Sequence, residues 1–453
     1  MQNHLLDGRV VTTFGLRKDS NFNRTAASTL LQADGFSADY ASDDSWPTNW
    51  FRRDGTTKTK GVVVKPLRGW SFIDRRAEQS AGLGQVALNF LRSINLHYNQ
   101  ADSFFPAPIA QNLKTELLPD PTGEGKDYGI SFNLFDKLVV RYNQYENGQV
   151  NSRTGDAGTI ATRAGRIDFA YAGNNDQFNL QRQAVAWVTA ANPTWTTAQI
   201  DTEVARQMGF PPDQLAQMNS NPVAETSDVV SKGKEIEISY NPTRFWTARL
   251  TVAQQKVVEQ NVTPAIQRYI DDRMPIWSTV VDTRTGERWF TTRYGSAGTA
   301  ADFLSGSVQA PYKLLRANEG KSRPQIRQWR VNAFSTLQLA ALTDHKWFKR
   351  VSVSGAMRWE DKASIGYYAY ANDPNAYDPS RRIYDESRYY VDFGGSYNTR
   401  IYRDKVGLRL QLNVRNAFEG GRLQAVGALP NGVPYNYRII DPRLFILSAT
   451  FSL

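Results

Sequence analysis

The chain has 453 residues, of which 22% are charged and 12% aromatic, with no cysteine and a formal net charge of +10 at pH 7. This aromatic content excludes a disordered chain, and the absence of cysteine excludes disulfides and thiolate chemistry. The mean hydropathy of −0.51 and the lack of any apolar run of about eighteen residues exclude a helical membrane protein. They do not exclude a membrane β-barrel, whose strands are apolar on one face only.

The first hundred residues contain three segments that predict strands. The chain starts without the charged and apolar regions of a signal peptide, and within its first ten residues it already has the pattern of a strand. The predicted strands lie in "RVVTTFGLR" (9–17), "GVVVKPL" (61–67) and "LRSINLHYN" (91–99).

Two hairpins follow, each with apolar and polar residues in alternation. "DYGISFNL" (127–134) turns at "FDK" and continues in "LVVRYNQYE" (138–146). The second hairpin joins "KEIEISY" to "FWTARLTVAQQ" through a turn that we expect at Asn241 and Pro242. One face of this hairpin carries Ile236, Ile238, Tyr240, Trp246, Ala248, Leu250 and Val252.

Between hairpins, very short connections alternate with two long ones, at about 147–228 and 261–323. A membrane barrel with tight turns at one end and elaborate loops at the other has this asymmetry. Both long loops contain a predicted helix. In the first, Ile200, Val204 and Met208 share one face, with a cap at Thr196 or Thr197 and a stop at Gly209. The second has its expected cap at Thr263 and Pro264 in its first turn, and it is expected to end before Pro275.

The last part of the chain has the strictest alternation. Val406, Leu408, Leu410, Leu412 and Val414 oppose Gly407, Arg409, Gln411, Asn413 and Arg415. The terminal segment "RLFILSATFSL" (443–453) carries an apolar row and turns hydroxylated on its other face. Further strands fit 329–340, 349–359 and 389–398. About twelve strands in all are predicted, each long enough to cross a bilayer when tilted.

No catalytic or metal-binding constellation emerges from the residues. His4, His97 and His345 lack the spacing of metal ligands, so each is interpreted as an ordinary polar position. The glycines of "GEGKDYG" precede a strand and indicate a turn rather than a phosphate loop. Basic residues are dispersed along the chain, without a nucleic-acid-binding motif. We therefore expect a non-enzyme without cofactor, metal or nucleic-acid partner.

Several segments together resemble the C-terminal half of a TonB-dependent outer-membrane receptor. The resemblance rests on "LLPDPTGEGKDYGISFNLFDKLVVRYNQYE", on "KGKEIEISYNPTRFWTARLTVAQQ", and on "LQLNVRNAFEGG" followed by "YRIIDPRLFILSATFSL". It extends from "RVVTTFGLRKD" to the last residue, in order and spacing. It implies an all-β fold for residues 1–453: an antiparallel transmembrane β-barrel, here partial, with long, partly helical extracellular loops.

The resemblance also implies a function, partners and a location. The expected function is TonB-dependent uptake of a scarce bulky nutrient, such as a metal chelate, cobalamin or glycan, in the outer membrane of a Gram-negative bacterium. Expected partners are outer-membrane lipid, the barrel-assembly machinery and TonB. The terminal apolar row would serve as the assembly signal: Phe445, Leu447, Phe451 and Leu453. The candidates for lumen-lining positions are Arg249, Asp392, Arg409, Gln411, Asn413 and Arg415.

The family also has an N-terminal plug domain, a TonB-binding segment and enough further strands to complete a barrel of roughly 22. None of these is recognised in this sequence. We therefore expect this chain alone to be a fragment that cannot perform TonB-dependent transport. The alternative hypothesis is a soluble, secreted all-β carbohydrate-binding protein, which would bury its apolar rows between two sheets.

Overall fold

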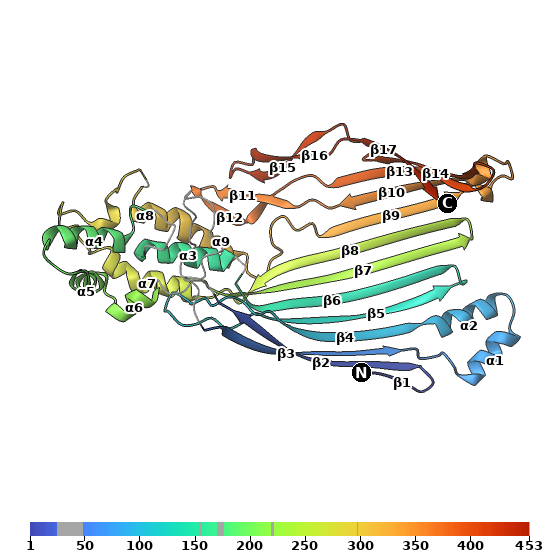
Figure 1. Ribbon diagram of the computed structural model, residues 1–453, viewed down its shortest axis with the longest axis horizontal. Coiled ribbons are helices and arrows are strands. Elements are labelled where there is room, and N and C mark those ends of the chain that lie inside the picture. The colour runs from blue at the N-terminus through green and yellow to red at the C-terminus, as the bar shows by residue number, and fades with distance from the viewer. Residues whose placement is uncertain (25–48, 154–155, 170–175, 219–221, 297, 453) are drawn as a thin grey trace.

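The computed structural model of the protein describes residues 1–24, 49–153, 156–169, 176–218, 222–296 and 298–452. Thirteen strands form one antiparallel sheet, in which nearly every strand pairs with its neighbours in the chain (Figure 1). They are β1 (Gln2–Leu5), β2 (Val10–Asn23), β3 (Phe51–Val64), β4 (Asn95–Phe104), β5 (Thr122–Leu134), β6 (Leu138–Ser152), β7 (Ser227–Thr243), β8 (Trp246–Gln260), β9 (Trp329–Gln338), β10 (Val351–Glu360), β13 (Arg388–Ile401), β14 (Val406–Arg415) and β17 (Leu444–Ser452).

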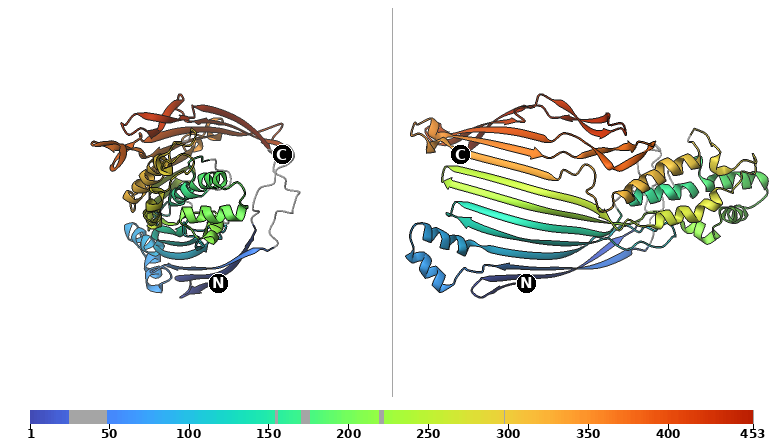
Figure 2. Two further views of the ribbon diagram at one scale, coloured as in Figure 1. Left: turned by 90° about the vertical axis from the view of Figure 1, so that its left-hand side faces the viewer. Right: turned by 180° about the vertical axis from the view of Figure 1, so that it is seen from behind.

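The sheet is a curved, open barrel wall. Seen along the strands it bends like a trough (Figure 2). The strands β1 and β17 form its two edges, and within the described residues they do not pair with each other. The predicted all-β, antiparallel class is confirmed, with thirteen strands in the sheet rather than about twelve.

The strand register gathers apolar side chains into continuous rows on one face. Directly paired residues lie on the same face of a sheet, so each row can be followed from strand to strand. One row crosses eleven strands and contains only apolar or aromatic residues: Leu5, Val10, Val64, Leu96, Ile130, Tyr142, Ile236, Val252, Val331, Trp359 and Tyr389. We call this side of the sheet the apolar face.

The other side of the sheet, the polar face, carries a very different row only one residue away. From β4 onwards this row contains His97, Gly129, Asn143, Glu235, Ala253, Arg330, Glu360 and Arg388. A shift of one residue in the register would exchange the two faces completely. The pairing is therefore strongly constrained by the sequence pattern.

The connections between strands differ sharply at the two ends of the sheet. At one end most are tight turns, with a helical pair, α1 (Ser71–Gln79) and α2 (Leu83–Ser93), between β3 and β4 (Figure 1). The β9–β10 connection at this end contains two short 3-10 helices, Leu339–Ala341 and Phe348–Arg350. The other end carries two small hairpins and the remaining described α-helices. The hairpins are β11 (Ser364–Tyr370) with β12 (Asp373–Tyr384) and β15 (Arg422–Ala428) with β16 (Pro434–Ile440).

The helices at the long-connection end form one helical module with the main apolar core. The β6–β7 connection supplies α3 (Asp156–Asp168), α4 (Leu180–Ala191), α5 (Thr197–Met208) and α6 (Pro212–Met218). The β8–β9 connection supplies α7 (Ala265–Trp277), α8 (Ala300–Phe303) and α9 (Ala310–Ala317). Among the described residues, the large buried cluster lies in this module and includes Trp187, Trp277 and Trp289. No described helix has the length and apolar character needed to cross a membrane.

Several local predictions are confirmed. The helix α5 begins after Thr196, whose side chain accepts from the Gln199 N–H, and it ends at Gly209 in the left-handed conformation with φ 69°. The "FDK" turn joins β5 to β6, with positive φ at Phe135 and Asp136.

Other local predictions are wrong. The strand predicted at 91–99 begins only at Asn95, because Leu91–Ser93 end α2, and the strand predicted at 61–67 ends at Val64. The turn expected at Asn241 and Pro242 lies further on. The strand β7 continues to Thr243 through a shift in register. The helix expected to end before Pro275 continues to Trp277.

Candidate anion-binding site

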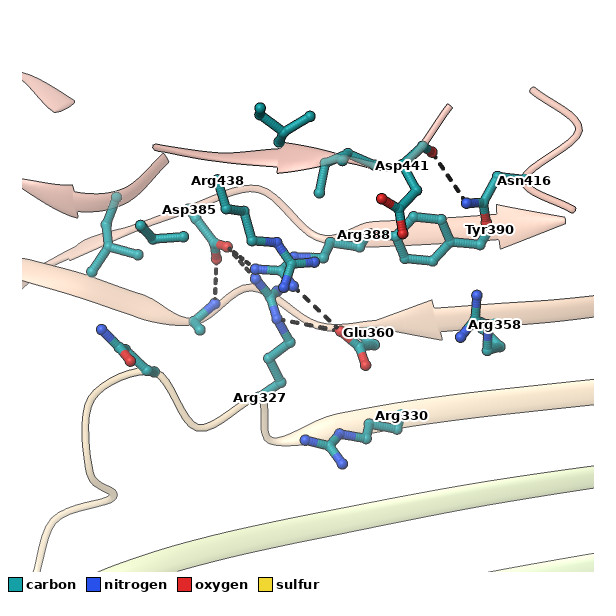
Figure 3. A pocket seen from close by; sticks show the side chains of 16 residues that line it. Arg327, Arg330, Arg358, Glu360, Asp385, Arg388, Tyr390, Asn416, Arg438 and Asp441 are labelled. Atoms are coloured by element: carbon teal, nitrogen blue, oxygen red, sulfur yellow. Dashed lines mark hydrogen bonds and ion pairs between the residues drawn. The ribbon is translucent and has the colours of Figure 1, made fainter. Parts of the chain in front are cut away.

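A cavity of about 600 Å³ lies on the polar face near the long-connection end. Its floor is formed by β9, β10 and β13, and its other walls by residues near or on the two small hairpins (Figure 3). A volume of this size is typical of ligand pockets. It is lined by Gln325, Arg327, Arg330, Arg358, Glu360, Ala363, Ile365, Asp385, Arg388, Tyr390, Asn416, Val426, Arg438, Ile439, Ile440 and Asp441.

The strand register itself builds the floor of the cavity. Glu360 on β10 pairs directly with Arg330 on β9 and with Arg388 on β13. Two residues away along β10, Arg358 pairs with Tyr390. The guanidinium carbon of Arg358 lies 5.2 Å from the centre of the tyrosine ring. Charged side chains from three strands are therefore fixed side by side by backbone pairing.

Asp385 organises the buried side of the cavity. Its carboxylate accepts from the backbone N–H of Ala363 at 2.6 Å and from Gln424 Nε2 at 3.0 Å. It also forms ion pairs with Arg327 and with Arg388, the latter at 3.4 Å. Since Asp385 and Arg327 are both buried, this network is held in one geometry and fixes the orientation of the two guanidinium groups.

Arg327 and Arg388 are further held by Glu360. Its Oε2 atom lies 3.5 Å from Arg327 Nε and 3.8 Å from Arg388 Nη1. Figure 3 shows the Arg327 side chain between the two carboxylates of Asp385 and Glu360. The acidic groups thus neutralise part of the charge of the two inner arginines.

Three further arginines surround this network without a carboxylate of their own among the described residues. Arg330, Arg358 and Arg438 are exposed, and Arg438 extends from β16 towards the inner arginines (Figure 3). Five arginines and three acidic residues line the cavity, so its net charge is positive. A guanidinium presents its donors in a planar fork that matches carboxylate or phosphate oxygens. The arrangement is suited to hold an anion.

Among the described residues, the polar side chains that line this cavity are guanidinium, carboxylate, amide and phenol groups. Within the described ranges, no group of three or more His, Asp or Glu side chains could hold a metal ion.

The sequence-predicted lumen-lining residues all lie on the polar face, but the structure does not gather them into one site. Arg249 belongs to the same cross-strand row as Asp392. Arg409, Gln411, Asn413 and Arg415 alternate along β14, from near the short-turn end to near the long-connection end. Arg409 lines a separate, shallow hollow with Arg350 and Thr450.

Asp392 has an indirect connection to the cavity. Its Oδ1 atom accepts the backbone N–H of Asn416 at 2.8 Å, and Asn416 lines the cavity wall. The side chain of Asn416 donates to the backbone oxygen of Asp441 at 3.1 Å. Asp392 is therefore a positioning residue for the segment that follows β14.

The residues of the predicted assembly signal lie on the apolar face of the edge strand. Phe445, Leu447 and Phe451 pair with Val414, Leu412 and Leu408 on β14. They are 62%, 77% and 63% exposed. Leu453 lies outside the described residues. Whether this row serves assembly remains a prediction.

Sequence reasoning missed the arginine cavity. The relevant signal is the position of the charges: Arg330, Glu360 and Arg388 each lie at or next to the strand end that faces a long connection. Such residues converge at one end of an antiparallel sheet. The contribution of Arg327, Asp385 and Arg438 depends on how the connections fold, and no local pattern predicts it.

The fold and this cavity define an open barrel wall with an arginine-lined site at one end. No protein-family model matches the sequence, and no curated protein sequence matches it. Among solved structures the chain is similar to the ferripyoverdine receptor of the outer membrane of Pseudomonas aeruginosa, with 12% identity and a TM-score of 0.47. It is also similar to the ferric preacinetobactin receptor of Acinetobacter baumannii (10%, TM-score 0.48) and the ferric-catecholate import receptor of E. coli K12 (14%, TM-score 0.44).

These matches cover 99%, 99% and 97% of this chain but only 37%, 41% and 42% of the receptors. The chain therefore spans about two fifths of the length of these receptors. With TM-scores below 0.5, the likeness is remote.

Proposed function

We propose that this chain forms the wall and outer loops of an outer-membrane receptor that takes up a scarce, bulky nutrient with energy from TonB. The observation that carries the proposal is the division of the sheet into an apolar face and a polar face, with the long connections at one end. In a membrane barrel the apolar rows contact lipid, the polar rows line the lumen, and the long loops are extracellular.

The exposure of the apolar rows supports this proposal over a soluble carbohydrate-binding protein. Soluble monomers rarely expose contiguous apolar patches of more than a few hundred square ångströms. Here Phe393, Leu412 and Leu447 are each more than two fifths exposed and lie on neighbouring strands. A soluble sandwich would cover these rows with a second sheet.

The arginine cavity favours one of the three ligand classes expected from the sequence. An anionic metal chelate offers carboxylate, catecholate or similar oxygens to the exposed guanidinium groups of Arg330, Arg358 and Arg438. Cyanocobalamin has one phosphodiester but no net charge, and neutral glycans have no charged group, so neither offers several anionic oxygens to these three guanidinium groups. We therefore assign the cavity to the capture of an anionic metal chelate at the outer end of the wall.

Ligand class is tested with three probes on the full chain in lipid nanodiscs: ferric citrate, cyanocobalamin and maltoheptaose. We expect ferric citrate to bind, with an affinity that falls as salt rises, and the two neutral probes not to bind. Arg330→Gln combined with Arg438→Gln should weaken ferric citrate binding at least tenfold, since each substitution removes a charge-assisted hydrogen bond worth about 1.5–3 kcal/mol.

The matched control is Arg350→Gln combined with Arg409→Gln, which removes the same charge from the separate hollow at the opposite end of the sheet. This control should leave binding within about twofold, because charges beyond a Debye length of about 8–10 Å are largely screened. Equal losses in both double variants, or tight binding of a neutral probe, would contradict the assignment of the cavity.

A further inference from the structure

The helical pair α1–α2 lies in the longest described connection at the end of the sheet that carries the tight turns, residues 65–94. Four other connections at this end, 6–9, 135–137, 244–245 and 402–405, are tight turns, as in membrane barrels generally, and the connection 339–350 is longer. Between β3 and β4, however, residues 65–94 form two helices that extend beyond the sheet (Figures 1 and 2). This position calls for a physical explanation.

Both helices are fixed to each other and to the sheet. Arg92 Nε on α2 forms an ion pair with Asp74 Oδ1 on α1 at 2.7 Å. Phe90 on α2 packs edge-on against Phe132, with 5.2 Å between the ring centres. Ser93 Oγ donates to Asn133 O at 3.0 Å and accepts the Asn133 N–H at 2.7 Å. The two helices therefore contact each other, and α2 is attached to the end of β5.

The helix α2 is docked on the apolar face of the sheet. Phe132 belongs to the cross-strand row that continues through Val140, Ile238 and Leu250. By its contact with Phe132, α2 lies on the same side as these residues. If that side faces lipid, as the proposed function requires, α2 lies beside the lipid as well.

Apolar side chains of the pair remain uncovered after this docking. On α2, Leu83, Ala87 and Leu91 lie on the same stripe as Phe90, at helical spacing, yet Leu83 is 85% exposed. On α1, Phe72 is 62% exposed. Trp70 precedes α1 and is about half exposed. The apolar stripe is wider than the part that the sheet covers.

Basic residues accompany these apolar side chains. The Arg76 guanidinium lies 5.2 Å from the centre of the Phe72 ring, and that of Arg9 lies 5.6 Å from the Trp70 ring. In the segment 65–94 the basic residues are Lys65, Arg68, Arg75, Arg76 and Arg92, against Asp74 and Glu78. The two adjoining short turns add Arg9 and Lys137, against Asp7 and Asp136.

We propose that the α1–α2 pair is an interfacial element that binds anionic phospholipids at the surface of the membrane. An amphipathic helix with exposed apolar residues and adjacent arginines lies in the interface, with its apolar stripe at the boundary with the acyl chains and its arginines on lipid phosphates. Continuity with the apolar face and the positive charge select an anionic lipid surface as the occupant. This inference rests on the proposed function, since it needs the apolar face to contact lipid.

The experiment uses the absence of native cysteine, which allows single labels in the full chain. Nitroxide labels are placed at Leu83→Cys and Leu91→Cys on the stripe, at Glu78→Cys on the exposed polar side, and at Leu412→Cys on the apolar face of β14. Each protein is reconstituted in phosphatidylcholine vesicles with or without phosphatidylglycerol. Collision of each label with oxygen, which partitions into lipid, and with a water-soluble nickel complex is then measured.

We expect labels at Leu83 and Leu91 to collide preferentially with oxygen, as at Leu412, while the label at Glu78 collides with nickel. Lipid contact at Leu412 with aqueous contact at Leu83 and Leu91 would overturn the inference and leave the proposed function standing. Aqueous contact at all sites would overturn the proposed function and this inference together. If the labels at Leu83 and Leu91 were shielded from both reagents, a protein partner would be indicated, and this result would also overturn the inference of lipid binding.

A second arm tests the anionic headgroup. Native mass spectrometry counts phosphatidylglycerol molecules bound to the full chain and to Arg75→Gln combined with Arg76→Gln. We expect a loss of phosphatidylglycerol affinity of about fivefold for each arginine, the usual effect of one basic residue near an anionic membrane. The matched control, Lys321→Gln with Arg381→Gln, removes two exposed charges at the opposite end and should not change binding. Equal losses in both double variants would refute the headgroup assignment.

Discussion

The carboxylate of Asp168 and the guanidinium of Arg273 form a buried, doubly hydrogen-bonded ion pair across 105 residues of sequence. Arg273 Nε lies 2.8 Å from Asp168 Oδ2, and Arg273 Nη2 lies 2.6 Å from Oδ1. The same carboxylate accepts from Tyr269 Oη at 2.6 Å and from Trp277 Nε1 at 2.9 Å. Because Asp168 ends α3 and Arg273 lies on α7, the pair joins two separate long connections into one helical module.

The surroundings of Arg273 favour its charged form. Burial alone would lower the pKa of Arg273, but the Asp168 carboxylate and the Tyr269 hydroxyl outweigh it, so that the pKa is raised. Arg273 Nη1 also donates to the backbone oxygen of Met208 at 2.8 Å, and the guanidinium lies 4.1 Å from the centre of the Phe210 ring. The charge is therefore satisfied on all sides, and loss of its partner would leave it buried and uncompensated.

We predict that Asp168→Asn destabilises the helical module by about 3–5 kcal/mol, the usual cost of removing one partner from a buried ion pair. Hydrogen exchange of the amides in α3 and α7 measures the free energy of opening this region. The matched control is Glu203→Gln on α5, which breaks an exposed pair with Arg206. It should cost no more than about 1 kcal/mol. Similar losses in the two variants would contradict the role assigned to Asp168.

The burial of Glu225 predicts that the stability of the same helical module depends on pH. It is 4% exposed, and within the described part of the chain its Oε1 atom accepts no hydrogen bond. Burial raises its pKa above the ordinary value of 4.5. The folded state thus binds this proton more tightly than the unfolded state does. The protonated Glu225 side chain therefore contributes to the free energy of unfolding below pH 4.5. This contribution is lost as the pH rises through the folded-state pKa of Glu225.

We therefore expect Glu225→Gln to reduce the fall in stability of the module between mildly acidic and mildly alkaline buffer. The urea midpoint, followed by near-ultraviolet circular dichroism, measures this fall. Glu203→Gln is again the control, since hydrogen bonds from Arg206 and Gln207 lower the pKa of Glu203 to about 2, outside this pH range. An unchanged slope in Glu225→Gln would show that Glu225 does not carry the effect.

An arginine substitution should have a large effect on one face of β14 and a small effect on the other. Leu410 lies on the apolar face and Gln411 on the polar face. If the apolar face contacts lipid, Leu410→Arg should destabilise the reconstituted protein by about 2–4 kcal/mol, the cost of an arginine facing the middle of a bilayer. Gln411→Arg should have little effect. Urea unfolding in lipid vesicles measures both, and equal costs at the two positions would argue against lipid contact.

Phe451 is predicted to matter more for assembly than for stability. It pairs with Leu408 at the edge of the sheet and is 63% exposed, so its truncation removes little packing. If the terminal apolar row is an assembly signal, Phe451→Ala in a complete receptor should strongly reduce the heat-modifiable barrel in outer-membrane fractions. Thr450→Ala, one residue away on the other face, should assemble normally. Normal assembly of the Phe451→Ala receptor would contradict the hypothesis that the terminal apolar row is an assembly signal.

The strands and their faces could be predicted from the sequence because alternation is a local property of the pleated backbone. Residues two apart share a face, so the rows of β14 and β17 follow directly from the order of their side chains. The boundaries of α5 were predictable for the same reason, since Thr196 and Gly209 act on the backbone within one turn.

The end of α7 is determined by tertiary contacts and not by the local signal at Pro275. A proline in a helix interior is costly, which predicts that α7 ends before it. Yet Trp277 is fully buried and its indole donates to Asp168. These contacts lie outside the helix and stabilise its last turn beyond the proline.

The arginine cavity depended on tertiary structure throughout. The sequence alone determined that Arg330, Glu360 and Arg388 are charged residues near strand ends, but not that they are direct neighbours. Only the register of three strands places them in one row, and only the fold of the connections brings Arg327, Asp385 and Arg438 over it. Alternation assigns each side chain to a face, whereas the distance between charges on different strands is set by long-range pairing that no local pattern encodes.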